Sequence, residues 1–427
     1  MKILNSNSKN FKKSLDILLQ KRKNKIRFNS MSVSSIIQDV KKNGDKAVLK
    51  YEKKFNKNKI IKPTSKQISK SISSLEKKVK KAIDLAYNRI YKFHSLQKFK
   101  NISYTDNLNN KLEYKYLPID SVALYVPGSS ASYPSSVLMS TIPAIIAGVK
   151  RIVMINPGLK GKQNPAVLYA ARKCKINEIY SIGGPSAIAA VAYGTKKIKK
   201  VDKIVGPGNL YVAAAKKEVF GDVGIEGMTA GPSEILIVCD KFSNPEWVAS
   251  DLIGQAEHDT LAQCILISKD KKLIGKVKIE ISKQLNQIPR SSIARKSLKS
   301  NGVLIYAGSD KKIIDISNQI SPEHLELNVK NYKSFIPRIK NAGSICLGKY
   351  AVMAMTDYNV GSNHVLPTNS SAKYSSGISV NEFYKRISYI NLSKRGIEKL
   401  GPSVITLANY EGLHAHAQSV KKRIRRK

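Results

Sequence analysis

The stretch SVALYVPGSSASYPSSVLMSTIPAIIAGVKRIVMI, residues 121–155, decides the fold class of this chain. It opens with the apolar run SVALYV (121–126) and closes with RIVMI (151–155), and each run has the length of a buried strand. Between them, a turn rich in Gly, Ser and Pro leads into small and apolar residues over 137–149, as in a helix packed on a sheet. Two buried strands joined by a crossover helix predict a parallel sheet.

The same alternation continues on the C-terminal side. Further strands are expected at 203–205, 234–239, 264–268, 303–306 and 344–347, and further helices at 166–173, 187–192 and 211–220. Residues 1 to about 115 are Lys-rich with a mostly helical pattern, and the chain after about 372 is polar and then helical. The sequence therefore predicts an α/β fold with parallel sheets and small helical extensions at both ends.

Length and composition set the broad class of protein. The chain has 427 residues, 42% of them hydrophobic, which suggests about two to three domains with real cores and argues against disorder. We expect no secretory signal in MKILNSNSKNFKKSLDILLQ and no membrane span, because no apolar run is long enough. The four cysteines, Cys174, Cys239, Cys264 and Cys346, form no CxxC pair. A cytoplasmic protein without a disulfide framework is therefore expected.

The charge of the chain is strongly positive. Lys+Arg number 74 and Asp+Glu 30, so the formal net charge is 74 − 30 = +44, a balance typical of nucleic-acid binders. Most of these cations are scattered lysines, which lack the rigid fork of arginine, and only KKRIRRK (421–427) is a dense cluster. We favour a charged, solvated surface over nucleic-acid binding, which stays an alternative.

Three Gly/Pro turns follow expected strands, at 126–136, 183–190 and 205–215. A strand, a glycine turn and a helix N-terminus offer backbone amides and a helix dipole to an anion such as a pyrophosphate. None of the three is a complete GxGxxG motif, and a single turn of this kind is more often a plain connection. Together they favour a dinucleotide site.

The histidines are concentrated in the second half of the chain. Five of the six lie between 258 and 416, beside other residues capable of chemistry. Gln255 and His258 share a helix face and Asp357 precedes His364 in a loop, while Glu323 adjoins His324. Glu411 is followed by His414 and His416. A Gln, two His and an Asp can bind a borderline cation such as zinc, which leaves a Glu–His pair for proton transfer.

Longer motifs make the chain similar to one enzyme family. YVPG, YPSSVLMSTIPA, KVDKIVGPGNLYVAAAK, AGPSEILIV, QAEHD, SPEHLE, NHVLPT and SSGISV occur in the order of the histidinol dehydrogenase family, between NGDKAV (43–48) and EGLHAHAQSV (411–420). The resemblance implies an NAD-dependent, zinc-containing enzyme that oxidises L-histidinol to L-histidine in two steps with two NAD+. This is the last step of histidine biosynthesis.

The resemblance also implies roles for single residues. Glu323 and His324 would transfer protons and activate water. The zinc ligands would be Gln255, His258, Asp357 and His416. These four and His324 would also contact the substrate, together with Ser233, His364 and Glu411. The contacts to NAD would be Tyr125, Ser186 and Asn209, although Ser186 stands where the family usually has Gln. Ser129, Thr356 and Ser362 are further departures, expected to affect the cofactor more than the reaction.

The implied fold has two incomplete Rossmann-like domains, arranged as in aldehyde dehydrogenases. An N-terminal arm (1–20) precedes a discontinuous first domain (21–120 and 233–372), and the second domain (121–232) lies on the NAD side. A C-terminal extension (373–427) would be exchanged between the subunits of a homodimer, so that His416 and Glu411 complete the site of the partner.

Two other enzyme mechanisms stay open at this point. A zinc hydrolase would use the same ligands without a need for the glycine turns. A dehydrogenase with a covalent thiohemiacetal would need a nucleophilic cysteine, but Cys264 and Cys346 lie within apolar strand patterns and are expected to be inert.

Overall fold

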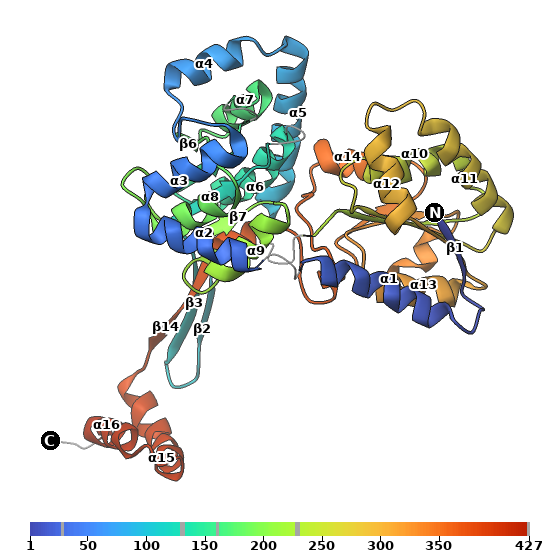
Figure 1. Cartoon of the computed structure of the whole chain (residues 1–427). Helices are drawn as coiled ribbons and strands as arrows, with labels where there is room; N and C mark the ends of the chain where they lie inside the picture. Colours follow the sequence, from blue (N-terminus) through green and yellow to red (C-terminus); the bar gives the residue numbers. More distant parts are fainter. Residues whose placement is uncertain (27–29, 129–132, 159–161, 227–230, 425–427) are drawn as a thin grey trace. The chain divides into compact units, whose positions relative to one another are not determined.

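A computed structural model describes residues 1–26, 30–128, 133–158, 162–226 and 231–424, and it divides into two compact units (Figure 1). The first comprises Met1–Gln97 and Asp120–Glu382 and holds two parallel sheets. The second comprises Lys98–Ile119 and Phe383–Lys427. Within the described residues, no helix is both long and apolar enough to cross a bilayer.

One parallel sheet of the first unit has five strands in the order β6-β5-β4-β7-β8. These strands are β4 (Ser121–Tyr125), β5 (Arg151–Ile155), β6 (Glu178–Tyr180), β7 (Lys203–Val205) and β8 (Gly224–Ile225). Its connecting helices are α6 (Pro134–Ala147), α7 (Pro165–Lys173), α8 (Gly184–Tyr193) and α9 (Leu210–Val219). Strand β4 is buried at every position, because it lies inside the sheet with helices on both faces.

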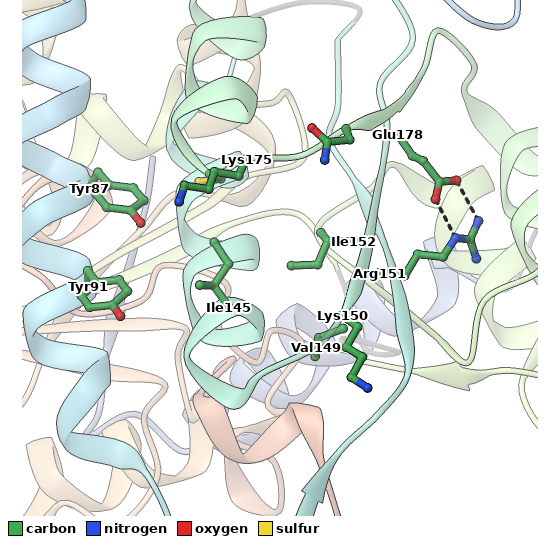
Figure 2. Close-up of a pocket in the computed structure, with 11 residues that line it drawn as sticks. Tyr87, Tyr91, Ile145, Val149, Lys150, Arg151, Ile152, Lys175 and Glu178 are labelled. Atoms are coloured by element: carbon green, nitrogen blue, oxygen red, sulfur yellow. Dashed lines mark hydrogen bonds and ion pairs between the residues drawn. The ribbon is translucent and has the colours of Figure 1, made fainter.

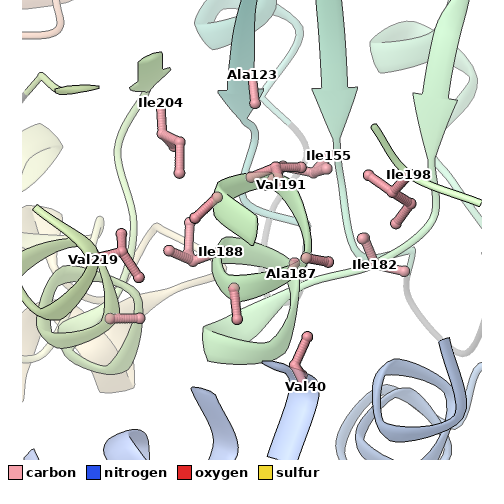
Figure 3. Packing of buried hydrophobic residues seen from close by; sticks show 14 of the residues in the cluster. Val40, Ala123, Ile155, Ile182, Ala187, Ile188, Val191, Ile198, Ile204 and Val219 are labelled. Carbon is pink, nitrogen blue, oxygen red and sulfur yellow. The ribbon is translucent and has the colours of Figure 1, made fainter. Parts of the chain in front are cut away.

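Helices from the N-terminal part of the chain cover this five-stranded sheet. They are α2 (Ser30–Asn43), α3 (Asp45–Tyr51), α4 (Ser65–Ser73) and α5 (Lys77–His94). Val40 of α2 lies below Ala187 and Val191 of α8, in one apolar cluster with Ala123 and Ile155 of the sheet (Figure 3). Gly44 separates α2 from α3 with a φ of 51°, a left-handed conformation that glycine adopts readily.

The other parallel sheet has six strands in the order β1-β11-β10-β9-β12-β13. These strands are β1 (Lys2–Asn5), β9 (Glu234–Cys239), β10 (Gln263–Ser268), β11 (Val303–Tyr306), β12 (His324–Asn328) and β13 (Ser344–Leu347). Its helices are α1 (Phe11–Ile26), α10 (Pro245–Ala256), α11 (Lys271–Gln284), α12 (Ser291–Asn301), α13 (Asp310–Ile320) and α14 (Met353–Tyr358). Apolar clusters lie on both faces of this sheet, one of them against α10, α11 and α12.

The second unit is an antiparallel sheet with a helical hairpin. Its strands, in the order β14-β3-β2, are β2 (Ile102–Thr105), β3 (Lys111–Pro118) and β14 (Tyr384–Asn391). Its helices are α15 (Lys394–Tyr410) and α16 (His414–Ile424). Several apolar side chains of this unit are exposed, among them Ile390, Leu407 and Tyr410 at 68%, 62% and 92%. A unit of this size buries little of its own surface.

The α/β class with parallel sheets is confirmed, but the segments combine differently from the predicted boundaries. Residues 1–5 do not belong to a separate arm, because β1 pairs with β11 in the six-stranded sheet. Helices α2–α5 pack mainly with the five-stranded sheet and its helices, although α5 also contacts residues 359–363 through Arg89 and His94. Residues 98–119 belong to the antiparallel unit with 383–427. An amphipathic pattern shows that a helix has a buried face but not which sheet covers that face, which explains the difference.

Candidate active site

The expected Glu–His pair lies at the amino end of a central strand. His324 is the first residue of β12, which pairs with β9 on one side and β13 on the other, and Glu323 directly precedes it. Both side chains are buried, with 3% and 7% of their surface exposed. Gln255 near the end of α10 and Asp357 near the end of α14 are buried as well. Buried polar groups of this kind need partners, so they mark a candidate site.

Four of the residues predicted from the sequence come together around His324. Its Nε2 atom lies 3.7 Å from Oδ1 of Asp357 and 4.0 Å from Oε1 of Glu323. The Nδ1 atom of His364 lies 2.8 Å from the backbone oxygen of Asp357, a hydrogen bond that fixes this ring as a donor at Nδ1. The other ring nitrogen, Nε2, lies 3.4 Å from Oγ of Ser136 at the start of α6. Residues of the loop after α14 and of strand β12 therefore lie in one cluster.

Glu323 is held by the neighbouring strand. Its Oε2 atom accepts a hydrogen bond of 2.8 Å from the backbone amide of Glu234, the first residue of β9. Ser233, a predicted substrate contact, directly precedes this residue, and its backbone oxygen accepts a bond from the amide of Gln263 at the start of β10. One carboxylate oxygen of Glu323 is therefore fixed, while the other points toward His324.

Burial shifts the pKa values of the histidines and of Asp357 in this cluster toward their neutral forms. It lowers the pKa of His324 to about 3, with help from the nearby imidazoles of His364 and His258. Burial likewise lowers the pKa of His364 to about 4, and it lowers that of His258, next to Arg290. Burial raises the pKa of Asp357 to about 7. Neutral imidazoles can accept a proton or bind a metal, so the histidines are in the form that either role requires.

The donor set fits a divalent metal such as zinc. Both polar atoms of the Gln255 side chain are buried without a hydrogen bond, and so are Oδ1 of Asp357 and Nδ1 of His324. Unsatisfied buried polar atoms are costly, and a cation shared by an amide oxygen, an imidazole and a carboxylate would satisfy them. Among the described residues, no three His, Cys, Asp or Glu side chains form a metal-binding group. Of the four predicted ligands, one is a glutamine and another, His416, belongs to the second unit.

His416 and Glu411 lie in the helical hairpin of the second unit. Glu411 follows α15 and His416 is in the first turn of α16, and both side chains are exposed. His414, two residues before His416, has its Nδ1 atom 3.2 Å from Oδ1 of Asn409. The predicted fourth ligand is thus available to a partner surface.

The predicted cofactor contacts lie at two glycine turns on the carboxyl edge of the five-stranded sheet. Tyr125 and Ser186 are buried at the Gly183–Gly184 turn, where the Tyr125 hydroxyl accepts a bond from the Gly184 amide and Ser186 donates to the Gly183 oxygen. Asn209 is exposed and caps α9 by accepting a bond from the Val212 amide. Asn209 is therefore the most accessible of the three. Ser129 lies outside the described residues.

A cavity of about 620 Å³ lies away from these residues (Figure 2). It is lined by Tyr87 and Tyr91 of α5 and by the start of β5, where Arg151 forms an ion pair with Glu178 at 2.7 Å. The start of β5 is at the amino edge of its sheet, whereas the glycine turns follow the carboxyl ends. The cavity contains none of the predicted site residues.

Glu52 is a buried carboxyl group at the Gly183 turn that sequence reasoning missed. It lies in a π-helical segment, Glu52–Asn56, and its Oε1 atom accepts a bond of 2.7 Å from the Gly183 amide. Burial raises the pKa of Glu52 from 4.5 to about 7. A π-helical turn is rare and often marks a functional segment. The segment YEKKFN carries no distinctive motif, so the sequence offered no signal for it.

Replacing Glu52 by glutamine should remove a pH dependence of stability. The folded chain binds a proton more tightly here than the unfolded chain, so stability is expected to fall as the pH rises from about 4.5 to about 7. Glutamine keeps an acceptor for the Gly183 amide but does not titrate. The free energy of unfolding of the variant, relative to that of wild type, should therefore be higher at pH 8 than at pH 4. The difference should be at most about 3 kcal/mol. Thermal unfolding across this range measures the difference, with the exposed Glu398→Gln as control. Parallel curves for wild type and Glu52→Gln would contradict the assignment.

Known proteins resemble this chain over nearly its whole length. A family model described as histidinol dehydrogenase matches residues 19–424. The histidinol dehydrogenase of Pelagibacter ubique is 79% identical over 427 residues, which is 100% of both chains. That of Brucella suis is 46% identical over 397 residues, or 92% of each chain. The crystal structure of histidinol dehydrogenase from Elizabethkingia anophelis has a TM-score of 0.90 and 36% identity, covering 99% of this chain and 98% of that one.

Proposed function

Since this chain belongs to the histidinol dehydrogenase family, we propose that it oxidises L-histidinol to L-histidine through L-histidinaldehyde, as the last step of histidine biosynthesis. Two molecules of NAD+ would accept the two hydrides. The observation that carries this proposal is the cluster of His324, Glu323, Asp357 and His364 at the amino edge of the six-stranded sheet. It combines a neutral buried base with a carboxyl group and unsatisfied donor atoms for a metal.

We propose Gln255, His258, Asp357 and His416 as ligands of one zinc ion per subunit. The unpaired buried atoms of Gln255 and Asp357 support this set. Zinc would supply a template that binds the imidazole and amine nitrogens of the substrate and polarises the reacting oxygen. Because the pKa of Asp357 is raised by burial in the metal-free chain, its carboxyl group gives up a proton when the ion binds.

His324 is proposed as the base that takes the hydroxyl proton of the substrate as a hydride leaves the same carbon. Its imidazole is neutral at physiological pH, and its Nδ1 atom has no other partner. His324 would pass this proton to solvent while Glu323 activates water for addition to the aldehyde, and the neutral His324 would then take the next hydroxyl proton during the second oxidation. The hydrogen bond from the Glu234 amide keeps Glu323 oriented between these steps.

The remaining predicted contacts bind the two substrates. Ser233 and His364 border the same cluster and would bind L-histidinol together with Glu411. For His364, the bond to the Asp357 backbone fixes the ring so that Nε2 is an acceptor. The accessible Asn209 would contact NAD+, with Tyr125 and Ser186 shaping the adjoining turn. Serine is shorter than the glutamine that the family usually carries at position 186, so we expect its contribution to be indirect.

We propose a homodimer in which the second unit of each subunit completes the site of the other. The exposed apolar residues Leu400, Val404 and Leu407 recur at helical spacing along α15 and form an unpartnered face. Ile387 and Tyr389 of β14 are partly exposed too. Such surfaces need a cover, and exchange between subunits would bring the exposed His416 and Glu411 to a partner. All four cysteines are free thiols, which supports a cytoplasmic location.

The test is NADH formation after L-histidinol is added to the purified protein, with and without a chelator. We expect two NADH per L-histidine formed, and we expect activity to be lost on chelation and restored by zinc. A single NADH per substrate would reject the two-step reaction, and activity that resists metal removal would reject the role of zinc. Absence of NADH with metal-dependent hydrolysis would favour a zinc hydrolase, whereas salt-sensitive DNA binding without any turnover would favour a nucleic-acid protein.

A further inference from the structure

A second pair of acidic residues lies directly beneath the candidate site. Glu326 follows His324 by two positions on β12, so the two side chains are on the same face of the sheet. Asp251 precedes Gln255 by four positions on α10, so these two share a helix face. The side chains of Asp251 and Glu326 hydrogen-bond to each other. None of the proposed catalytic, metal or substrate roles uses either residue.

Glu326 also reaches a third element of the site. Its Oε1 atom accepts a hydrogen bond of 2.7 Å from the backbone amide of Met353, the first residue of α14. Asp357 lies in the last turn of this short helix. Only 1% of Glu326 is exposed, so its two contacts are shielded from water. One side chain therefore connects α10, β12 and α14, the three elements that carry Gln255, His324 and Asp357.

The protonation of the two carboxyl groups allows a hydrogen bond between them. Two carboxyl groups hydrogen-bond only if one of them keeps a proton, which then lies between their oxygens. Burial raises the pKa of Glu326 to about 8, with a contribution from the charge of Asp251, and burial raises that of Asp251 to about 6. The two carboxyl groups therefore share one proton, and Glu326 also accepts the bond from the Met353 amide. A buried side chain that hydrogen-bonds to two elements restricts the movement of both.

We propose that Asp251 and Glu326 are positioning residues, whose shared hydrogen bond holds α10, β12 and α14 in the arrangement that presents Gln255, His324 and Asp357 to metal and substrate. The proposal deepens the proposed function and rests on it for the identity of the metal. Partners behind the ligands of a metal site commonly change metal affinity or activity by about 10- to 100-fold when they are replaced.

The experiment compares Glu326→Leu with Glu326→Gln in the full-length protein. Glutamine reproduces both bonds, because its amide nitrogen can donate to Asp251 and its oxygen can accept from Met353. Leucine removes both at similar volume. We expect Glu326→Leu to weaken zinc binding and to lower kcat/KM for L-histidinol by about 10- to 100-fold each. Its melting temperature should fall, because replacing only one partner leaves the Asp251 carboxyl group and the Met353 amide without their hydrogen bonds. Glu326→Gln should stay within about threefold of wild type.

Hydrogen exchange of the metal-free protein separates this proposal from the proposed function. The amides of α14, Met353 first, should lose protection in Glu326→Leu but keep it in Glu326→Gln, whether or not the protein oxidises L-histidinol. Asp251→Leu removes the hydrogen bond between α10 and Glu326 but keeps the bond from the Met353 amide to Glu326. It serves as a second variant if Glu326→Leu fails to fold. It should weaken zinc binding while leaving the exchange of α14 unchanged. Ser317→Ala, a buried polar change in α13, is the control and should alter neither property.

The proposal is overturned if Glu326→Leu keeps wild-type zinc affinity and unchanged exchange in α14. It is also overturned if Glu326→Gln loses as much of both as Glu326→Leu, because the hydrogen bonds would then not be what matters. A wild-type protein that neither binds zinc nor forms NADH would reject the proposed function, while the exchange measurements would still decide whether the pair positions α14.

Discussion

Replacing His324 with asparagine is expected to lower kcat for L-histidinol oxidation by roughly 10²- to 10⁴-fold, the usual contribution of a general base. Asparagine is polar and smaller, so it is tolerated in the buried position, but it cannot take a proton near neutral pH. The zinc content should be unchanged, because His324 is not among the four proposed ligands. Steady-state kinetics with both substrates measures the effect, and most of it should be in kcat and not in KM.

His414→Asn is the matched control for this substitution. His414 is exposed, bonds only within the helical hairpin, and has no proposed role, so turnover should stay close to that of wild type. If His324→Asn kept wild-type turnover with intact zinc, the base would have to be another group, and Glu323 would be the first to test. If zinc were lost as well, His324 would be a ligand and the proposed metal set would need revision.

A heterodimer of one His324→Asn chain and one His416→Asn chain should have about half of the wild-type activity per dimer, although each variant homodimer is nearly inactive. If the helical hairpin of each subunit serves the other, one of the two sites combines both substitutions and the other combines none. Differently tagged chains, co-expressed and purified by both tags, give this heterodimer. A site built within each single chain predicts no activity in the same sample.

The reciprocal heterodimer reverses both expectations. One chain carries His324→Asn and His416→Asn together and the other is wild type. With exchanged hairpins each site then receives one defect, and the dimer should be nearly inactive. Sites contained within single chains would leave the wild-type subunit intact at about half of the wild-type activity. The two samples have opposite expected results for shared and for separate sites, and together they decide between the two arrangements.

Much of the architecture was predictable from short apolar runs. RIVMI, EILIVC, CILIS and VLIY form β5, β9, most of β10 and β11, because strands covered on both faces are mostly apolar. The break between α2 and α3 at Gly44 was visible as a Gly-Asp pair. In these segments the hydrophobic pattern of the sequence matches the burial in the structure, so the elements could be predicted.

Other strands could not be recognised by apolar content. Strand β12 (HLELN) alternates leucine with His, Glu and Asn, and all five positions are buried because the strand lies inside the sheet between β9 and β13. In the second unit, β14 pairs with β3 over Tyr384↔Pro118 to Asn391↔Lys111, a contact between distant segments with mostly exposed residues. Pairing of this kind depends on where the two segments meet in space, and no local pattern encodes it.

The candidate site, like the fold, was only partly predictable from the sequence. The polar residues around His258, His324 and Asp357 were visible as clusters along the sequence, and the family resemblance supplied their expected roles. Only folding brings the His364 ring onto the Asp357 backbone and the Glu323 carboxyl onto the Glu234 amide. The Asp251–Glu326 pair gave no signal at all, since an isolated carboxylate in a sequence is normally a solvated surface group.

The pairing of β1 with β11 affects when the six-stranded sheet can form during synthesis on the ribosome. Lys2 is the partner of Val303, so about 300 further residues must be synthesised after β1 before its neighbour exists. The five-stranded sheet and its helices, encoded between residues 30 and 225, can assemble in the meantime. We expect β1 to stay unpaired until residues 303–306 have been synthesised, and the six-stranded sheet to be the slower of the two to form.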